Sequence, residues 1–279
     1  MKAIRSLAFV VNDDKAGAPA LARELMALAK GSGVRVRLTA RFPLPKDYLK
    51  GADACCVIGG DGTLLGVARE AALAKVPIIG VNRGTLGFLT TYSADEARAE
   101  FAGILKGDYQ VDSRAMLQCV MPDGTSDLAL NDVLVKAATN SPLMRLEVRA
   151  DDELVTEYLC DGLIFSTATG STAYNLSAGG PIIHPTARVI AMTPICPHTL
   201  SNRSIIFREE VQLRVRNRTS DEPLLVSFDG QRNVQFAGDG ALKISVSKVR
   251  LPLAQKPGYG HFAVVRQKLK WSGGLIEQG

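Results

Sequence analysis

Residues Gly59-Gly60-Asp61-Gly62-Thr63 combine a glycine cluster with a carboxylate, a combination typical of a site that handles phosphate. They follow the apolar run Ala54–Ile58 and precede a helix-like run from about Leu64 to Ala74. Glycines let the backbone approach an anion, and a helix N-terminus supplies free N–H donors. A carboxylate there repels phosphate unless it binds Mg²⁺ or accepts a proton from an attacking hydroxyl. The motif therefore predicts phosphoryl transfer to an alcohol.

Other interpretations of Gly59–Thr63 stay open on this motif alone. Glycine and aspartate at this density also form ordinary turns, because glycine adopts positive φ and aspartate bonds to its own backbone. The segment is not a dinucleotide fingerprint, because Leu65 stands where a third glycine is required.

A second cluster, Thr167–Pro181, is dense in small hydroxyl residues and glycines. Hydroxyls, backbone amides and the Tyr174 ring can surround a nucleotide, with the ring stacked on a base. The alternative is a Ser/Thr-rich loop that caps the short helical run Ala173–Ala178. The cluster lacks the lysine of a Walker A loop, and Ser177 lacks the flanking glycines of a nucleophile elbow.

Asn131 and Asp132 interrupt a strand predicted over Ala129–Lys136. Adjacent side chains of a strand point to opposite faces, so at least one of the two would face the core. Because an unpaired buried carboxylate is costly, we expect a β-bulge at a ligand site, with the pair bound to ribose hydroxyls. The alternative is an edge strand with both side chains in solvent. Asp161 precedes Gly162 at the start of another strand, and its carboxylate could likewise either bind a ligand or lie in solvent.

Composition indicates a globular protein that neither spans a membrane nor binds nucleic acid. Of 279 residues, 46% are apolar and 22% charged. No apolar run approaches the roughly 18 residues that a membrane helix needs. The net charge of +5 comes from dispersed basic residues and suits a small anionic ligand.

The N-terminus and the cysteines favour a cytoplasmic protein. Met1–Val11 has basic residues before an apolar run but no cleavage site after it, so it predicts a first strand rather than a signal peptide. The five cysteines form no CxxC pair, and the three histidines lack metal-ligand spacing. We expect reduced, structural cysteines.

The first third of the sequence alternates strands with helices, which predicts a parallel sheet covered on both faces. Ligands of such sheets bind at the C-terminal ends of the strands, where Gly59–Thr63 and Asn82–Phe88 fall. A capping box of Ser93 and Glu96 begins a helix that continues to Leu105. The other elements are strands Ile4–Val11, Val34–Thr39, Ala54–Ile58 and Val76–Val81, helix Pro19–Lys30 with Leu21, Leu25 and Leu28 on one face, and helix Leu64–Ala74.

From about Arg114 the pattern changes to many short strands separated by turns, which predicts a β-rich domain. The strands are expected at Met116–Met121, Ala129–Lys136, Leu146–Ala150, Leu163–Ser166, Ile205–Phe207, Val211–Val215, Leu224–Phe228, Val234–Phe236 and Leu242–Val246. We expect an α/β domain with a Rossmann-like sheet over residues 1–113, to which the tail 257–279 returns, and a β-rich domain over residues 114–256.

The sequence resembles the NAD kinase family over nearly its whole length, from about Phe9 to Gln231. The glycine motif alone is shared with diacylglycerol and sphingosine kinases, whereas Thr169–Asn175 is much more specific. The segments that carry the resemblance, in this order, are Gly59–Thr63, Asn131-Asp132, Asp161-Gly162, Thr169–Asn175, Thr193–Arg203 and Asp229-Gly230-Gln231.

The resemblance implies a bacterial-type ATP-NAD kinase with an α/β N-terminal domain and an all-β sandwich C-terminal domain, the NAD kinase/diacylglycerol kinase-like fold. Its reaction would be Mg²⁺-dependent transfer of the ATP γ-phosphate to the adenosine 2′-hydroxyl of NAD. No fixed set of protein ligands for Mg²⁺ is identified; the ion would accompany ATP, near Asp61.

The family's functional residues map onto this sequence by motif. Asp61 would be the general base. The phosphates of ATP would lie on Gly59, Gly60, Gly62 and Thr63. NAD would be bound by Asp61, Gly62, Asn131, Asp132, Asp161, Thr172, Ala173, Tyr174, Asn175, Leu176, Ser177 and, at the rim, Gln231.

Two positions depart from the family pattern. Many members have glutamate where this sequence has Asp132, which keeps the charge but shortens its reach. Some bacterial members have arginine where this sequence has Leu159, so the choice between NAD and NADH stays open, as do the donor (ATP or polyphosphate) and feedback regulation.

Two other functions were weighed. A lipid kinase of the diacylglycerol type would need an exposed apolar or amphipathic basic segment for reaching a bilayer, and none is seen. A non-catalytic nucleotide sensor would lack Asp61, which is present.

The resemblance also implies a homodimer or homotetramer in which neighbouring subunits complete each other's sites. Apolar residues surround Asp161 and follow Tyr174, and we expect them to form a patch that a monomer would not expose. The patch would consist of Leu159, Leu163, Ile164, Phe165 and Pro181–Ile183.

Overall fold

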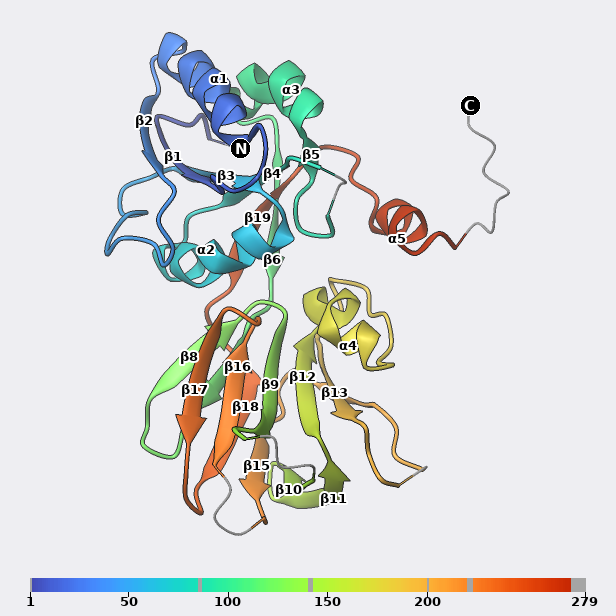
Figure 1. The fold of residues 1–279 in the computed structure, drawn as a ribbon. Coiled ribbons are helices and arrows are strands. Elements are labelled where there is room, and N and C mark those ends of the chain that lie inside the picture. Colours follow the sequence, from blue (N-terminus) through green and yellow to red (C-terminus); the bar gives the residue numbers. More distant parts are fainter. Residues whose placement is uncertain (1, 85–86, 140–142, 200, 220–222, 272–279) are drawn as a thin grey trace. The chain divides into compact units, whose positions relative to one another are not determined.

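The computed structural model describes residues 2–84, 87–139, 143–199, 201–219 and 223–271. The chain divides into two compact units: residues 1–113 with 251–279, and residues 114–250. The α/β fold expected for the N-terminal part and the β-sandwich expected for the C-terminal part are both confirmed (Figure 1).

The first unit is built on a seven-stranded sheet in the order β2-β1-β3-β4-β19-β6, with β5 also paired to β4. The pairs β1–β2, β1–β3, β3–β4 and β4–β19 are parallel. All six residues of β3 are buried, as expected for a central strand covered on both faces. The strands are β1 (Ser6–Val11), β2 (Arg35–Thr39), β3 (Ala54–Gly59), β4 (Ile78–Asn82), β5 (Tyr92–Ser93), β6 (Gln110–Arg114) and β19 (Leu251–Gln255).

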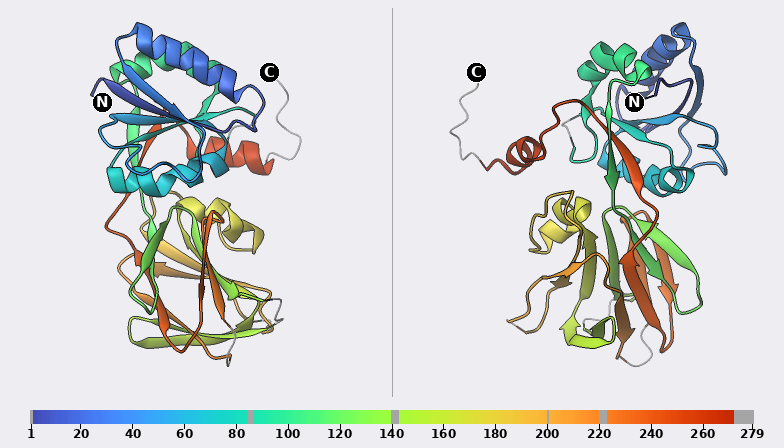
Figure 2. Two further views of the ribbon diagram at one scale, coloured as in Figure 1. Left: turned by 60° about the vertical axis from the view of Figure 1, so that its left-hand side comes forward. Right: turned by 180° about the vertical axis from the view of Figure 1, so that it is seen from behind.

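Helices cover both faces of this sheet. α1 (Ala18–Gly31) and α3 (Ala94–Lys106) pack on one face, and α2 (Asp61–Ala74) packs on the other (Figures 1 and 2). A further helix, α5 (His261–Leu269), follows β19.

Two sequence predictions about these helices have opposite outcomes. The capping box is confirmed: the Ser93 N–H donates to Glu96 Oε2 at 2.8 Å, and the Glu96 N–H donates to Ser93 Oγ at 3.2 Å. In α1, Leu21 and Leu25 are fully buried but Leu28 is 49% exposed. The prediction that Leu28 shares their buried face is wrong, because Ala29, four residues after Leu25, takes the buried position there.

The second unit consists of two six-stranded antiparallel sheets, in the orders β11-β10-β15-β18-β7-β8 and β14-β13-β12-β9-β16-β17. The first sheet contains β7 (Leu117–Val120), β8 (Ser126–Ala129), β10 (Met144–Ala150), β11 (Glu153–Cys160), β15 (Leu213–Asn217) and β18 (Ala241–Val246). The second contains β9 (Asp132–Ala137), β12 (Gly162–Thr167), β13 (Val189–Ile195), β14 (Ile205–Arg208), β16 (Leu224–Phe228) and β17 (Arg232–Phe236).

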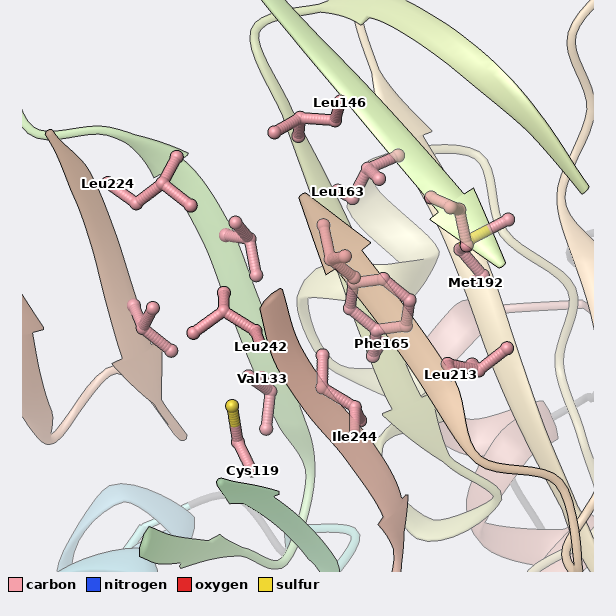
Figure 3. Close-up of a cluster of buried hydrophobic side chains, with 14 of the residues drawn as sticks. Cys119, Val133, Leu146, Leu163, Phe165, Met192, Leu213, Leu224, Leu242 and Ile244 are labelled. Atoms are coloured by element: carbon pink, nitrogen blue, oxygen red, sulfur yellow. The ribbon is translucent and has the colours of Figure 1, made fainter. Parts of the chain in front are cut away.

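Alternate side chains from both sheets form one hydrophobic core. Val133 and Phe165 come from one sheet and Leu146 and Ile244 from the other, and all four are fully buried (Figure 3). This period of two along each strand places the remaining side chains on the outer faces. On the outer face of β15, Arg216 is exposed and Arg214 is half-buried.

Three predictions about the second half of the chain require correction. The strand expected over Ala129–Lys136 is two strands in different sheets, β8 and β9, so the expected β-bulge is absent. Residues 251–255 form β19 in the sheet of the first unit, so the boundary expected after residue 256 lies after residue 250. Leu163, Ile164 and Phe165 are fully buried, so they do not form the exposed apolar patch expected around Asp161.

Candidate active site

The glycine motif lies at the C-terminal end of β3, where the sheet geometry predicts a ligand. Gly59 ends the strand, Gly60 is the N-cap of α2, and Asp61 is the first residue of the helix. A Cβ on Gly59 would lie 2.4 Å from Thr63 Oγ1, so a larger residue does not fit there. The Gly60 N–H donates to Thr63 Oγ1 at 3.4 Å, and Gly60 itself offers no side chain to cap the helix. Because the first N–H groups of a helix have no partner within it, this end of α2 can bind an anion.

The Asp61 carboxylate is held by the segment that follows β4. Oδ2 accepts the Phe88 N–H at 2.8 Å. Oδ1 accepts the N–H groups of Leu89 at 3.2 Å and Thr90 at 3.1 Å, and the Thr90 hydroxyl at 3.0 Å. Oδ1 is thus fully occupied, whereas Oδ2 keeps an open lone pair. A Cβ on Gly87 would lie 1.9 Å from Asp61 Oδ1, so this contact requires glycine at position 87.

Sequence analysis missed Lys15, which lies beside the glycine motif. Its ammonium donates to the Gly59 carbonyl at 3.0 Å and to Asn82 Oδ1 at 3.4 Å. A Cβ on Gly60 would be 3.1 Å from Lys15 Nζ. The signal was available, because Lys15 follows β1, and β1 pairs in parallel with β3.

In the second unit, the structure brings the Asn131-Asp132 and Thr167 motifs together. The Thr167 N–H donates to the Asn131 carbonyl at 2.9 Å, and the Thr167 hydroxyl donates to the Leu130 carbonyl at 2.7 Å. A Cβ on Gly170 would lie 2.1 Å from the Asn131 carbonyl oxygen, so only glycine allows this approach.

Asn131 and Asp132 are buried, with 7% and 6% of their surfaces exposed. The alternative of an edge strand with both side chains in solvent is therefore wrong; β9 lies between β12 and β16. Asn131 Oδ1 is buried and has no hydrogen-bond partner among the described residues. A buried acceptor without a partner is costly, so its presence indicates a ligand donor.

Asp132 shares its environment with a second carboxylate, Asp229. Burial, and secondarily the charge of Asp229, raise the pKa of Asp132 to about 7. Burial raises the pKa of Asp229 to about 6, although three backbone N–H groups and Arg232 oppose that shift. This part of the site therefore titrates near neutral pH.

The Thr167–Pro181 segment forms a 3₁₀ turn, Thr169–Thr172, and a short helix, α4 (Tyr174–Ser177). Tyr174 and Ser177 are exposed, while Thr172, Ala173 and Leu176 are half-buried. These five residues are accessible to a ligand.

Asn175 differs from its neighbours because it is fully buried. Its amide donates to the carbonyls of Ser171 at 3.1 Å and Pro181 at 3.0 Å, and its oxygen accepts the Thr193 hydroxyl at 2.7 Å. The Asn175 side chain therefore holds the loop, and no surface of it is free for a ligand.

The last two expected site residues lie in different surroundings. Gln231 is exposed and follows the turn that carries Asp229, with its N–H bonded to the Phe228 carbonyl at 2.9 Å. Asp161 is exposed and precedes β12, whereas Thr167 ends it. The length of that strand, roughly 20 Å at about 3.3 Å per residue, separates Asp161 from the Asn131–Thr167 contact.

The described ranges also bear on metal ligands and membrane-spanning helices. These residues include no group of three histidine, cysteine, aspartate or glutamate side chains placed to hold a metal ion. No described helix is long and apolar enough to cross a membrane. All five cysteines are free thiols; four are buried and Cys196 is exposed.

Comparison with known proteins gives consistent matches for both units. Residues 44–109 match the ATP-NAD kinase N-terminal domain, and residues 130–255 match the ATP-NAD kinase C-terminal domain. A curated NAD kinase of Syntrophobacter fumaroxidans is 40% identical over 229 residues, covering 81% of each chain. One of Geobacter sulfurreducens is 38% identical over 232 residues, covering 82% of each.

Solved structures are similar over nearly the whole chain. An NAD kinase from Archaeoglobus fulgidus in complex with ATP superposes with a TM-score of 0.77 at 27% identity, covering 95% of this chain and 98% of that one. Yeast NADH kinase complexed with NADH has a TM-score of 0.82 at 23% identity, covering 100% and 90%, and at that identity it supports the fold alone.

Proposed function

Since the chain belongs to the ATP-NAD kinase family and has its activity, the ATP-dependent phosphorylation of NAD, we propose how its residues divide that reaction. The first unit binds the phosphates of ATP and supplies the base. The second unit binds NAD. The observation that carries this assignment is the Asp61 carboxylate, positioned by four hydrogen bonds in the first turn of a glycine-capped helix.

The ATP phosphates bind at the N-terminus of α2. The N–H groups around Gly62 and Thr63 have no helical acceptor, and the helix dipole favours an anion there. Gly59 allows Thr63 to pack against the end of β3, and Gly60 places no side chain between Lys15 and the helix N-terminus. Lys15 adds a positive charge beside Gly60. Together these groups stabilise the charge of the transferred phosphoryl group.

Asp61 accepts the proton of the adenosine 2′-hydroxyl as that oxygen attacks the γ-phosphorus of ATP. Its Oδ2 has the open lone pair that proton transfer requires, and the bonds to residues 88–90 fix its orientation. The oxygen–phosphorus bond to the β-phosphate then breaks, giving NADP and ADP. A positioned base of this kind contributes about 10²–10⁴-fold to a rate.

Mg²⁺ enters as part of the MgATP substrate. Of the two Asp61 oxygens only Oδ2 can accept a further contact, and no cluster of three potential protein ligands exists among the described residues. The donor set therefore fits an ion held mainly by phosphate oxygens, near Asp61, rather than by the protein alone.

NAD binds to the accessible residues of the second unit. Asn131 Oδ1 and the Asp132 carboxylate accept hydrogen bonds from dinucleotide hydroxyls or amides, which would satisfy the buried acceptor of Asn131. Tyr174 lies against a ring, and Gln231 lies at the rim. The remaining contacts of the second unit come from Thr172, Ala173, Leu176 and Ser177, while Asn175 supports the loop from within.

Asp161 acts on the NAD of a neighbouring subunit. Within one chain the length of β12 separates it from Asn131, and a homodimer or homotetramer would bring it to the dinucleotide bound by another subunit. The free, buried cysteines are in keeping with a cytoplasmic location, where thiols stay reduced.

A coupled assay tests this function. The protein is incubated with ATP, Mg²⁺ and NAD, and NADP is read with an NADP-specific dehydrogenase. Parallel reactions with NADH or inorganic polyphosphate identify the preferred acceptor and donor. Absence of NADP formation by folded protein under all these conditions would contradict the assignment. A reaction with diacylglycerol as acceptor serves as the negative control, since none of the comparisons favours a lipid kinase.

A further inference from the structure

Three successive backbone N–H groups in the second unit converge on one side chain. The N–H of Leu130 donates to Asp229 Oδ2 at 2.8 Å. Those of Asn131 and Asp132 donate to Asp229 Oδ1 at 2.6 and 3.1 Å. The donors occupy the point where the chain leaves β8 in one sheet and enters β9 in the other. A chain that changes sheets cannot satisfy all these N–H groups within one strand ladder, so the carboxylate takes the place of a neighbouring strand.

The backbone around Asp229 fits this task. Asp229 and Gly230 both have positive φ, +54° and +64°, and form the turn between β16 and β17. Aspartate is among the few side chains that accept such a conformation. The Asp229 N–H also donates to the Asp132 carbonyl at 3.0 Å. Arg232, just after the turn, bonds to Asp127 and to the Leu128 carbonyl, which ties β17 to β8.

The opposite side of the Asn131 backbone is held by Thr167 and Ser166. The Asn131 carbonyl accepts the Thr167 N–H at 2.9 Å and the Ser166 hydroxyl at 3.3 Å. Both backbone polar groups of Asn131 are thus fixed by the protein, while its side-chain oxygen is buried without a partner among the described residues. The surrounding bonds fix the direction of a side chain that itself has no protein partner.

We propose that Asp229 is the positioning residue of the NAD-binding pair: its carboxylate orients Asn131 and Asp132 through their backbone N–H groups. This role rests on the assignment of Asn131 and Asp132 to NAD binding. Asp229 touches neither substrate nor the reacting atoms in this scheme.

The charges around the pair add a second readout for this positioning role. Asp229 is the charged neighbour that raises the pKa of Asp132, and Arg232 is the one that lowers the pKa of Asp229. From β12, on the other side of β9, the residue opposite Asp132 is the uncharged Ser166. The two carboxyl groups therefore titrate as a coupled pair around neutral pH. A neutral group at position 229 lets Asp132 ionise at lower pH.

The test is the variant Asp229→Asn, with Asp239→Asn, an exposed aspartate of the same unit, as matched control. Asparagine keeps the size and one acceptor oxygen, but it turns an NH₂ group toward one of the three N–H donors. We expect KM for NAD to rise at least about tenfold, with kcat and KM for ATP changing much less. The pH dependence of kcat/KM for NAD should move to lower pH by about one unit. Asp239→Asn should match the unchanged protein.

A second variant covers the case in which Asp229→Asn does not fold. Gly230→Ala keeps the carboxylate, and its Cβ meets no atom within 4 Å, but φ of +64° strains the turn. It should raise KM for NAD without moving the pH profile.

The proposal is overturned if a folded Asp229→Asn, or Gly230→Ala where it does not fold, has an unchanged KM for NAD. A lower melting temperature with unchanged KM and pH profile would show a purely structural residue. If the unchanged protein makes no NADP from NAD, the function itself fails; if it does and the variants match it, only this inference fails.

Discussion

The Asp61 carboxylate accepts four hydrogen bonds, all of them from donors on residues 88–90. The sequence predicted that Asp61 is the base and that it lies at the end of a strand, because an aspartate between glycines at such a position has few roles. It could not predict the partners, since residues 88–90 become neighbours only when β4 pairs with β3. The sequence did not predict the contacts of Asp229 for the same reason. Asp229 lies almost a hundred positions after the residues whose N–H groups it accepts.

We predict that Asp61→Asn lowers kcat by about 10²–10⁴-fold, because asparagine cannot accept the proton of the 2′-hydroxyl. Binding of NAD, measured by calorimetry, should persist. Asp95→Asn, at an exposed position in the first turn of α3, is the control and should leave kcat unchanged. A near-normal kcat in Asp61→Asn would remove this carboxylate from catalysis.

Substitution of the two buried asparagines Asn131 and Asn175 should have opposite effects on binding and stability. Asn131→Ala removes an acceptor without a protein partner, so we expect NAD binding to weaken by roughly 1.5–3 kcal/mol with little loss of stability. Asn175→Ala breaks three buried hydrogen bonds and should lower the melting temperature instead. Asp132→Ala should resemble Asn131→Ala in binding. Calorimetric binding and thermal unfolding measure both quantities, and the reverse pattern would make Asn131 structural.

At the scale of elements, local signals predicted most of the first unit and less of the second. Strand–helix alternation and the Ser93–Glu96 capping box depend on neighbouring residues, and both appear in the structure. The break between β8 and β9 was missed, because it depends on which sheet each strand joins, and no local pattern records that. Strands β11 and β13 were also not predicted; Pro194 lies within β13, and such a residue argues against a strand.

Gly87 tests whether the segment after β4 sets the geometry of Asp61. We expect Gly87→Ala to displace either that segment or the carboxylate, because the new Cβ would lie 1.9 Å from Oδ1. The kcat should fall toward that of Asp61→Asn. Gly31→Ala is the control, since its Cβ meets nothing within 4 Å at the end of α1. Steady-state kinetics compare them, and equal kcat values would show that the loop does not set this geometry.

For the whole molecule, the argument for assembly rests on Asp161 rather than on an apolar patch. The sequence-based reason was wrong for Leu163, Ile164 and Phe165, which are buried, whereas Leu159 and Pro181 are exposed. The separation along β12 is an independent reason, and composition could not reveal it. A sequence shows which residues are adjacent in the chain, not which of them share a ligand.

Subunit complementation tests the shared site. Asp161→Ala and Asn131→Ala should each have low activity alone. Mixed, unfolded together and refolded, they should recover about a quarter of normal activity, because half the dimers are hybrids with one intact site of two. Analytical ultracentrifugation checks that assembly occurred. No recovery in verified hybrids would place each complete site within one chain.

The position of β19 has a consequence for synthesis of the protein. β19 lies between β4 and β6, so the first sheet is incomplete until residues 251–255 arrive. While the ribosome is still translating the second unit, β6 has no neighbour and Ile78 and Ile79 lack the partners that Leu253 and Ala254 supply. Many proteins fold from the N-terminus as they emerge from the ribosome. Here the first unit is translated first, but its sheet is completed last. Released chains that end at residue 250 should therefore be cut by protease within residues 2–113, while 114–250 resists.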